Sequence, residues 1–96
     1  MKIWLDDIRK APNGYHHTYS VNETKKYIIY CEHKNIKIEL LDLDHDLGDY
    51  AFDGGDAIKL VLWLAETERY YPITIHSMNP VGRDNMQAII SRYWPN

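Results

Sequence analysis

The sequence predicts one α/β domain, residues 1–96, in which a parallel sheet of about four strands carries helices on its faces. Three short apolar runs, residues 2–5, 38–43 and 73–75, each stop at polar residues, which is typical of buried strands. Helical patterns separate these runs, and such alternation forms parallel sheets through right-handed crossovers. Ligands of such sheets bind outside the carboxyl ends of the strands.

The first expected strand is residues 2–5, because Asp6 and Asp7 stop its apolar run. Residues 10–14 then have the composition of a turn, with Pro, Asn and Gly in succession. A short second strand is expected over residues 18–21. The connection between these strands is too short for a full helix.

A helix is expected after this strand, because Ser20 and Glu23 have the spacing of a capping box. Its apolar positions share one face and it should end near Asn35. The next apolar run, up to Leu43, is the strongest strand candidate, and it ends at residues 44–48, Asp-His-Asp-Leu-Gly.

A second helix is expected over residues 57–65, which are apolar almost all round and follow the turn-like Asp-Gly-Gly-Asp of residues 53–56. A brief strand follows at residues 72–75. Asn79 as a cap and Pro80 at the first helical position then predict the last helix.

Composition limits the possible functions. The 96 residues are 45% hydrophobic, a small core to which a homodimer would add burial, and the net charge is -3. That charge argues against binding to long duplex DNA, while a small nucleotide or RNA terminus remains compatible. No apolar stretch suits a signal peptide or membrane span, and the single cysteine excludes an internal disulfide, so we expect a cytoplasmic protein without membrane contact.

Four acids follow two strands that should be neighbours: Asp6 and Asp7 after the first, Asp44 and Asp46 after the central one. Like charges gathered at one edge repel, so such a group calls for a hard cation or a shared proton. We expect these four residues to bind Mg²⁺ or Mn²⁺. The alternative is that each aspartate only caps a turn.

His45 and His76 follow neighbouring strands and are candidates for proton transfer, His76 as base and His45 as acid. The alternative is that each is a hydrogen-bonded structural residue, and strand alternation would point His45 away from its acidic neighbours. His16 and His17 lie in an expected loop and are assigned to solvated surface.

The segment from Ser77 to Arg83 joins a strand to a helix, where free N–H groups and the helix dipole receive anions. We expect Ser77, Asn79 and Arg83 to bind phosphate, with Arg9 as a further cation. The alternative is a capped helix with an exposed arginine.

The sites together resemble a receiver domain of two-component signalling, with an acidic pair, a later aspartate and a small hydroxyl residue after successive strands. More closely, the sequence resembles the derived family called the cyclic-phosphate processing receiver domain. The blocks that carry this resemblance are residues 4–9 (Trp-Leu-Asp-Asp-Ile-Arg), 43–48 (Leu-Asp-His-Asp-Leu-Gly), 55–56 (Gly-Asp), 63–64 (Trp-Leu) and 76–86 (His-Ser-Met-Asn-Pro-Val-Gly-Arg-Asp-Asn-Met).

The resemblance implies a receiver-like, flavodoxin-type three-layer fold that recognises or processes cyclic phosphates of nucleotides or RNA ends, with phosphoesterase activity as the leading hypothesis. Asp44, His45 and His76 would be catalytic. A non-catalytic sensor and a phosphoacceptor using Asp44 are the alternatives. Receivers also use a lysine after a fifth strand, which this sequence lacks, so ordinary phosphorelay is not expected. Two aspartates compete for the place of the acceptor, because Leu40-Leu41-Asp42-Leu43 imitates the strand of a receiver whereas Asp44-His45-Asp46 matches the derived family. Asp44 is favoured, and the position of Asp42 on the opposite strand face from Leu43 is compatible with a contact to solvent or a helix and no chemistry.

Overall fold

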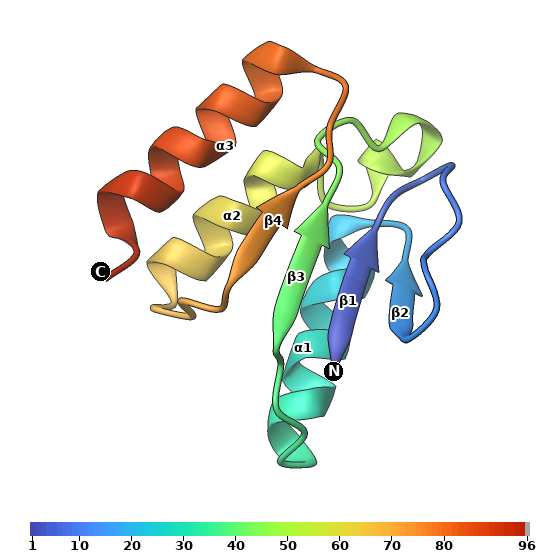
Figure 1. Cartoon of the computed structure of the whole chain (residues 1–96), viewed down its shortest axis with the longest axis vertical. Coiled ribbons are helices and arrows are strands. Elements are labelled where there is room, and N and C mark those ends of the chain that lie inside the picture. Colours follow the sequence, from blue (N-terminus) through green and yellow to red (C-terminus); the bar gives the residue numbers. More distant parts are fainter. Residues whose placement is uncertain (96) are drawn as a thin grey trace.

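The computed structural model describes residues 1–95 and contains a four-stranded parallel sheet in the order β2-β1-β3-β4 (Figure 1). The strands are Lys2–Leu5 (β1), Tyr15–Thr18 (β2), Leu40–Leu43 (β3) and Ile73–Ile75 (β4). The helices are Val21–His33 (α1), Ala57–Glu66 (α2) and Pro80–Tyr93 (α3), with a short 3₁₀ helix, η1, at Gly48–Phe52. The receiver-like α/β fold class is therefore confirmed.

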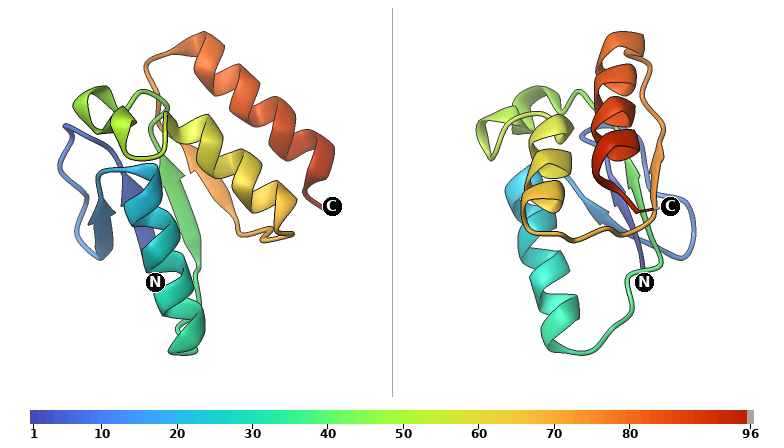
Figure 2. Two further views of the ribbon diagram at one scale, coloured as in Figure 1. Left: turned by 180° about the vertical axis from the view of Figure 1, so that it is seen from behind. Right: turned by 90° about the vertical axis from the view of Figure 1, so that its left-hand side faces the viewer.

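All three helices lie on one face of the sheet (Figure 2). The crossovers from β2 to β3 and from β3 to β4 run in the same direction, so right-handed connections place α1 and α2 on the same side. The sequence predicts helices on both faces in three layers, and the structure corrects this to two layers. The reason is that residues 6–14 connect β1 to β2 without a helix, which leaves the second face bare.

The two faces of the sheet differ in the side chains they carry. Ile3, Leu5, Leu41 and Leu43 point towards the helices and are fully buried in the core. Alternate positions face the helix-free side, where Trp4 on β1 pairs in register with Asp42 on β3 and Asp42 with Thr74 on β4. Asp42 is nevertheless only 8% exposed. Among residues 1–95, none of the helices has the length and apolar character needed to cross a bilayer.

Strand β2 lies earlier than the residues 18–21 that the sequence predicts, so His16 and His17 are in a strand and not in a loop. The helix cap explains the difference. The Ser20 hydroxyl accepts from the backbone N–H of Glu23 at 3.1 Å, so the chain must leave the sheet before Ser20. The predicted cap of α1 is thus confirmed, and the helix ends at His33 as expected.

The turn at residues 53–56 has a structural role. The Ser20 hydroxyl and the Asn22 side-chain amide donate to the Asp53 carboxylate at 2.6 and 3.1 Å. Gly54 and Gly55 then take positive φ angles of 109° and 90°, which glycine adopts without strain. These contacts tie the start of α1 to the start of α2.

Candidate functional site

Three aspartates from two adjacent strands meet at the carboxyl edge of the sheet, the edge towards which the strand arrows point in Figure 1. Asp6 and Asp7 follow β1 and Asp44 follows β3; the Asp44 N–H donates to the Leu5 carbonyl at 2.9 Å and keeps the strand ends together. Each aspartate offers a carboxylate oxygen, and the three oxygens lie within 4.8 Å of one another. We call Asp6, Asp7 and Asp44 the acidic triad.

A pocket of about 280 Å³ lies at the acidic triad. Two of its lining residues are apolar and strongly exposed, Ile8 at 84% and Met78 at 80%. The residues that line it are Asp6, Asp7, Ile8, Arg9, Asp44, Asp46, Gly48 and Met78. The pocket thus combines carboxylates and one guanidinium with a flexible apolar rim.

Asp6 is fully buried and held by three donors. Its Oδ1 accepts from the backbone N–H groups of Ile8 and Arg9, both at 2.8 Å, and its Oδ2 faces His76 Nε2 at 2.9 Å. Burial alone raises the pKa of Asp6, but these backbone and imidazole contacts outweigh it, so the pKa lies below its usual value. Asp6 is therefore a fixed, ionised carboxylate.

Asp44 has the opposite electrostatic character. Burial raises its pKa, and the negative charge of Asp6 raises it further, against the smaller opposing effects of His76 and the Ser77 hydroxyl. Burial and the neighbouring charge of Asp6 thus both disfavour the ionised form of Asp44.

Asp7 depends on a glycine for its position. Gly48, with φ of +52°, lies so close that a Cβ there would be 2.5 Å from Asp7 Oδ2. A side chain at residue 48 would therefore require the Asp7 carboxylate to move. The Gly of the Asp-His-Asp-Leu-Gly block is thereby tied to the acidic triad.

His76 lies between two carboxylates. Its Nδ1 is 2.6 Å from Asp42 Oδ1 and its Nε2 is 2.9 Å from Asp6 Oδ2. Carboxylates only accept, so each contact is a hydrogen bond when the facing nitrogen carries a proton. Both ring nitrogens are thus occupied, and proton abstraction by His76, as the sequence suggests, would require one contact to break.

The sequence profile of the family described as the Cyclic-phosphate processing Receiver domain matches residues 1–92. The chain belongs to this family. Searches of curated proteins and of solved structures find no match to it. The match spans the sheet, the acidic triad and nearly all of α3, so it covers the candidate site of this receiver domain as a whole.

His45, the other histidine that the sequence proposes for proton transfer in this receiver domain, contacts its neighbour in sequence, Asp46. Its Nδ1 is 2.7 Å from Asp46 Oδ1, although strand alternation predicts that it points away. The side chain lies beyond the end of β3, where that alternation no longer applies. Its ring packs on Gly82, where an added Cβ would be 2.5 Å from the ring Cγ. The hydrogen bond from His45 is the main reason why the pKa of Asp46 lies below its usual value. His45, Asp46 and Asp56 also form a second cluster of side chains that could hold a metal ion.

The four expected phosphate ligands are placed differently from one another. Arg9 lines the pocket and its Nη1 donates to the His76 carbonyl at 3.2 Å. Ser77 and Asn79 are engaged in the turn: the Ser77 hydroxyl accepts from the Asn79 N–H, and the Asn79 side chain caps α3 through the Gly82 N–H, both at 3.1 Å. Arg83 is exposed on the first turn of α3 and does not line the pocket.

Sequence reasoning missed three residues of this region. Asp42 bonds His76 instead of facing solvent or a helix, Trp4 stacks on the His76 ring with centroids 3.8 Å apart, and the ring of His17 bonds the Asp6 carbonyl through Nε2 at 2.7 Å. The available signal was period-two alternation, which places Trp4 and Asp42 on the same face at paired positions.

Proposed function

We propose that this receiver domain binds the cyclic phosphate of a nucleotide or an RNA end in the pocket at the acidic triad, and hydrolyses it with a divalent cation. The observation that carries the proposal is the convergence of three carboxylate oxygens within 4.8 Å of one another, with no lysine or arginine in an ion pair with them among residues 1–95. The family to which the chain belongs is described by cyclic-phosphate processing, which supports this class of ligand.

The donor set fits a hard cation. Three carboxylates match the oxygen ligands of Mg²⁺ and Mn²⁺, and Asp46 lines the same pocket as a further acid. When bound, such an ion polarises a phosphoryl oxygen and lowers the pKa of bound water. The chain's own part is to hold these carboxylates, Asp6 by three donors and Asp7 by the space at Gly48.

The organic part of the ligand suits the pocket rim. Ile8 and Met78 are exposed beside the acids. Contact with a base or a ribose would remove their apolar side chains from water, which is favourable. Arg9 is the pocket's guanidinium and would orient the phosphate. We assign Ser77 and Asn79 to shaping the turn that carries the rim and to holding its acids, because Ser77 bonds Asp44 and the Asn79 side-chain amide donates to Asp46 at 3.2 Å in addition to the bonds within the turn.

Ring opening forms one P–O bond from water and breaks one in the ring, so the water loses a proton and the leaving oxygen gains one. His45 does not itself line the pocket, but its partner Asp46 does, and within residues 1–95 no hydrogen bond engages its Nε2, so we assign proton transfer to His45. Asp46, which lines the pocket, orients it. Asp44 lines the same pocket and contributes a carboxyl group whose pKa is raised.

The second candidate is a non-catalytic sensor of the same ligands. The observation that favours it is the engagement of both His76 nitrogens, which leaves the pocket one fewer free proton carrier than the two-histidine scheme needs. In a sensor the same residues hold the ligand and no bond breaks. A phosphoacceptor role for Asp44 would instead give a base-labile acyl phosphate.

The experiment is a panel of 2′,3′- and 3′,5′-cyclic nucleotides and RNA oligonucleotides with a 2′,3′-cyclic phosphate, each with and without Mg²⁺ or Mn²⁺. Binding is measured by thermal shift and products by chromatography. We expect cation-dependent ring opening that falls about 10²- to 10⁴-fold in His45→Ala. His33→Ala, an exposed histidine at the end of α1, is the matched control. Binding without turnover would replace the enzyme with the sensor, and no binding at all would refute both.

A further inference from the structure

One hydrogen-bonded path runs from the helix-free face of the sheet to the acidic triad. Asp42, on β3, contacts His76, and His76 contacts Asp6. We propose that Asp42 and Trp4 are positioning residues: they fix the His76 ring, and His76 fixes the Asp6 carboxylate in the orientation that binds a divalent cation. This inference rests on the proposed function and gives a role to Trp4, which belongs to the block of residues 4–9, and to Asp42; the sequence assigned neither of them one.

The His76 ring is held at both nitrogens and on one face. Asp42 Oδ1 lies 2.6 Å from Nδ1, and Asp6 Oδ2 lies 2.9 Å from Nε2. Trp4 stacks on the ring at a centroid distance of 3.8 Å and an interplanar angle of 5°. Two hydrogen bonds fix the direction of the ring and the stack fixes its plane, so the ring has little freedom left.

A second set of contacts closes the path. The indole Nε1 of Trp4 donates to the Arg9 carbonyl at 3.0 Å, and the Arg9 backbone N–H donates to Asp6 Oδ1 at 2.8 Å. The Arg9 guanidinium donates to the His76 carbonyl at 3.2 Å. Trp4 is therefore linked to Asp6 both through His76 and through Arg9.

The path ends at Asp6, so we infer that it orients this carboxylate in addition to stabilising the fold. Asp6 is completely buried, and it is the member of the triad that receives the most hydrogen bonds from the chain. Groups that orient a metal ligand from behind typically change metal affinity 10- to 100-fold when they are removed. A merely structural pair would hold residues 6–14 against the sheet and leave the affinity of a folded variant unchanged.

The test is the dissociation constant of Mg²⁺ in the full chain, measured by calorimetry. Asp42→Asn and Trp4→Leu should each raise it about 10-fold or more, although neither residue belongs to the triad. Trp4→Leu changes no charge, which separates positioning from simple attraction of the cation. Asp49→Asn, an exposed acid on η1, is the charge control and should change it by less than about 3-fold.

A second readout does not depend on affinity. In the wild-type chain Mg²⁺ should shift the ¹H–¹³C signal of the His76 ring, because His76 contacts a ligand of the ion, and this shift should shrink in Asp42→Asn. Trp4→Phe keeps an aromatic stack and serves if Trp4→Leu does not fold; it should bind Mg²⁺ more tightly than Asp42→Asn.

Two results would overturn the inference, and they are distinguishable. If the wild-type chain binds Mg²⁺ and both Asp42→Asn and Trp4→Leu bind it as tightly as Asp49→Asn does, the positioning role is wrong while the cation site stands. If the wild-type chain itself binds no divalent cation, the cation site fails and the positioning role fails with it.

Discussion

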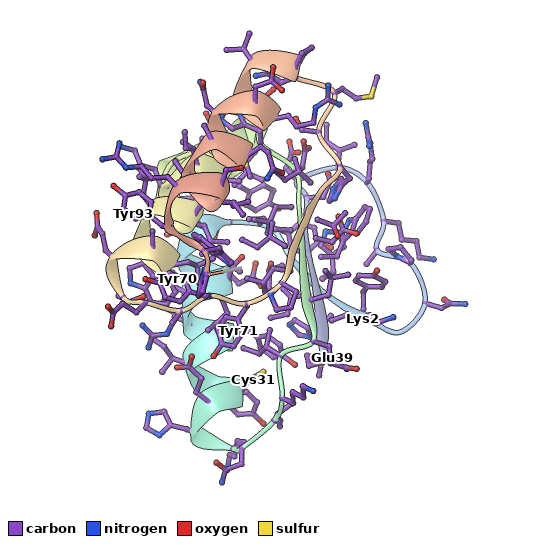
Figure 3. All side chains as sticks on the ribbon, turned by 60° about the vertical axis from the view of Figure 1, so that its left-hand side comes forward. Lys2, Cys31, Glu39, Tyr70, Tyr71 and Tyr93 are labelled. Carbon is purple, nitrogen blue, oxygen red and sulfur yellow. The ribbon has the colours of Figure 1, made fainter. Side chains whose placement is uncertain are left out.

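Two regions of the molecule hold half-buried or buried carboxylates: one pairs its carboxylate with an arginine, and the other gathers carboxylates together without a lysine or arginine partner among residues 1–95. On α1, Glu32 accepts from Arg69 Nε at 3.0 Å and Nη2 at 3.1 Å, and Tyr71, which lies beside this helix in Figure 3, donates its hydroxyl. At the other end of the strands the acidic triad gathers three carboxylates. Within residues 1–95, no lysine or arginine forms an ion pair with them.

The pKa shifts show the same contrast. The Arg69 guanidinium, above all, holds the pKa of Glu32 below its usual value, whereas burial and the charge of Asp6 raise that of Asp44. An acid with a cation of its own serves the fold. The acids of the triad face one another without a lysine or arginine partner among residues 1–95, and the proposed function depends on this difference.

The largest effect on stability should come from breaking the paired region. Arg69→Met removes a bidentate partner and leaves Glu32 with Tyr71 alone, so we expect a loss of about 1–3 kcal/mol in the free energy of unfolding. Chemical denaturation measures it. Arg83→Met, at an exposed site on α3, should change the value by less than about 0.5 kcal/mol. Equal losses in the two variants would contradict the structural role of the Glu32 pair.

The next effect tests the position of Asp7. Gly48→Ala and Gly14→Ala both put a side chain at positive φ, +52° and +87°, but only at Gly48 does the new Cβ meet Asp7, at 2.5 Å. We expect Gly48→Ala to displace the Asp7 carboxylate, because its Cβ would meet Asp7 Oδ2, whereas the Cβ of Gly14→Ala meets no atom within 4 Å. It should also weaken Mg²⁺ binding, and Gly14→Ala should not. Thermal melts with and without Mg²⁺ decide this, and indistinguishable variants would be the contrary result.

The smallest effect is a gain in stability. Asp44→Asn removes a repulsive charge and should stabilise the cation-free chain at neutral pH. Because the pKa of folded Asp44 lies above its usual 3.8, the ionised group destabilises the fold at neutral pH, and the penalty fades as pH falls through the raised pKa towards 3.8.

Glu32 has the opposite sign, and this gives the pH control. The pKa of folded Glu32 lies below its usual 4.5, so its stabilisation is complete above 4.5 and is lost as pH falls through the lowered pKa. Unfolding measured from neutral to acid pH should therefore show the gain of Asp44→Asn shrinking and the loss of Glu32→Gln shrinking as well. An unchanged gain in Asp44→Asn at acid pH would mean that charge repulsion is not its cause.

The sequence predicts the meeting of strand ends because this depends on order and direction alone. Apolar runs that stop at Asp6 and at Asp44 belong to parallel strands, and parallel strands end at the same edge. The caps of α1 and α3 are equally local, since Ser20 and Asn79 act on residues three positions away. Such features need no knowledge of the tertiary structure.

The rest depends on contacts distant in sequence. Asp42 and His76 are 34 residues apart, and whether Asp42 meets solvent, a helix or a histidine depends on which face of the sheet the helices cover. The sequence does show that residues 6–14 are too short for a helix, but not that the bare face would carry a buried polar path. Residues 15–18, Tyr-His-His-Thr, lack the apolar run that identifies a strand, and only pairing with β1 makes them one.

The most direct test of the central claim is the melting temperature of the wild-type chain, Asp7→Asn and Asp49→Asn with and without millimolar Mg²⁺ or Mn²⁺. A ligand that binds only the folded state stabilises it by mass action, by about 2.7 kcal/mol at one hundred times its dissociation constant. We predict that the ion raises the melting temperature of the wild-type chain and of Asp49→Asn, and that Asp7→Asn loses this increase while being at least as stable as the wild type without the ion. An unchanged melting temperature in the wild-type chain, or an increase that Asp7→Asn retains in full, would contradict a cation site at the acidic triad.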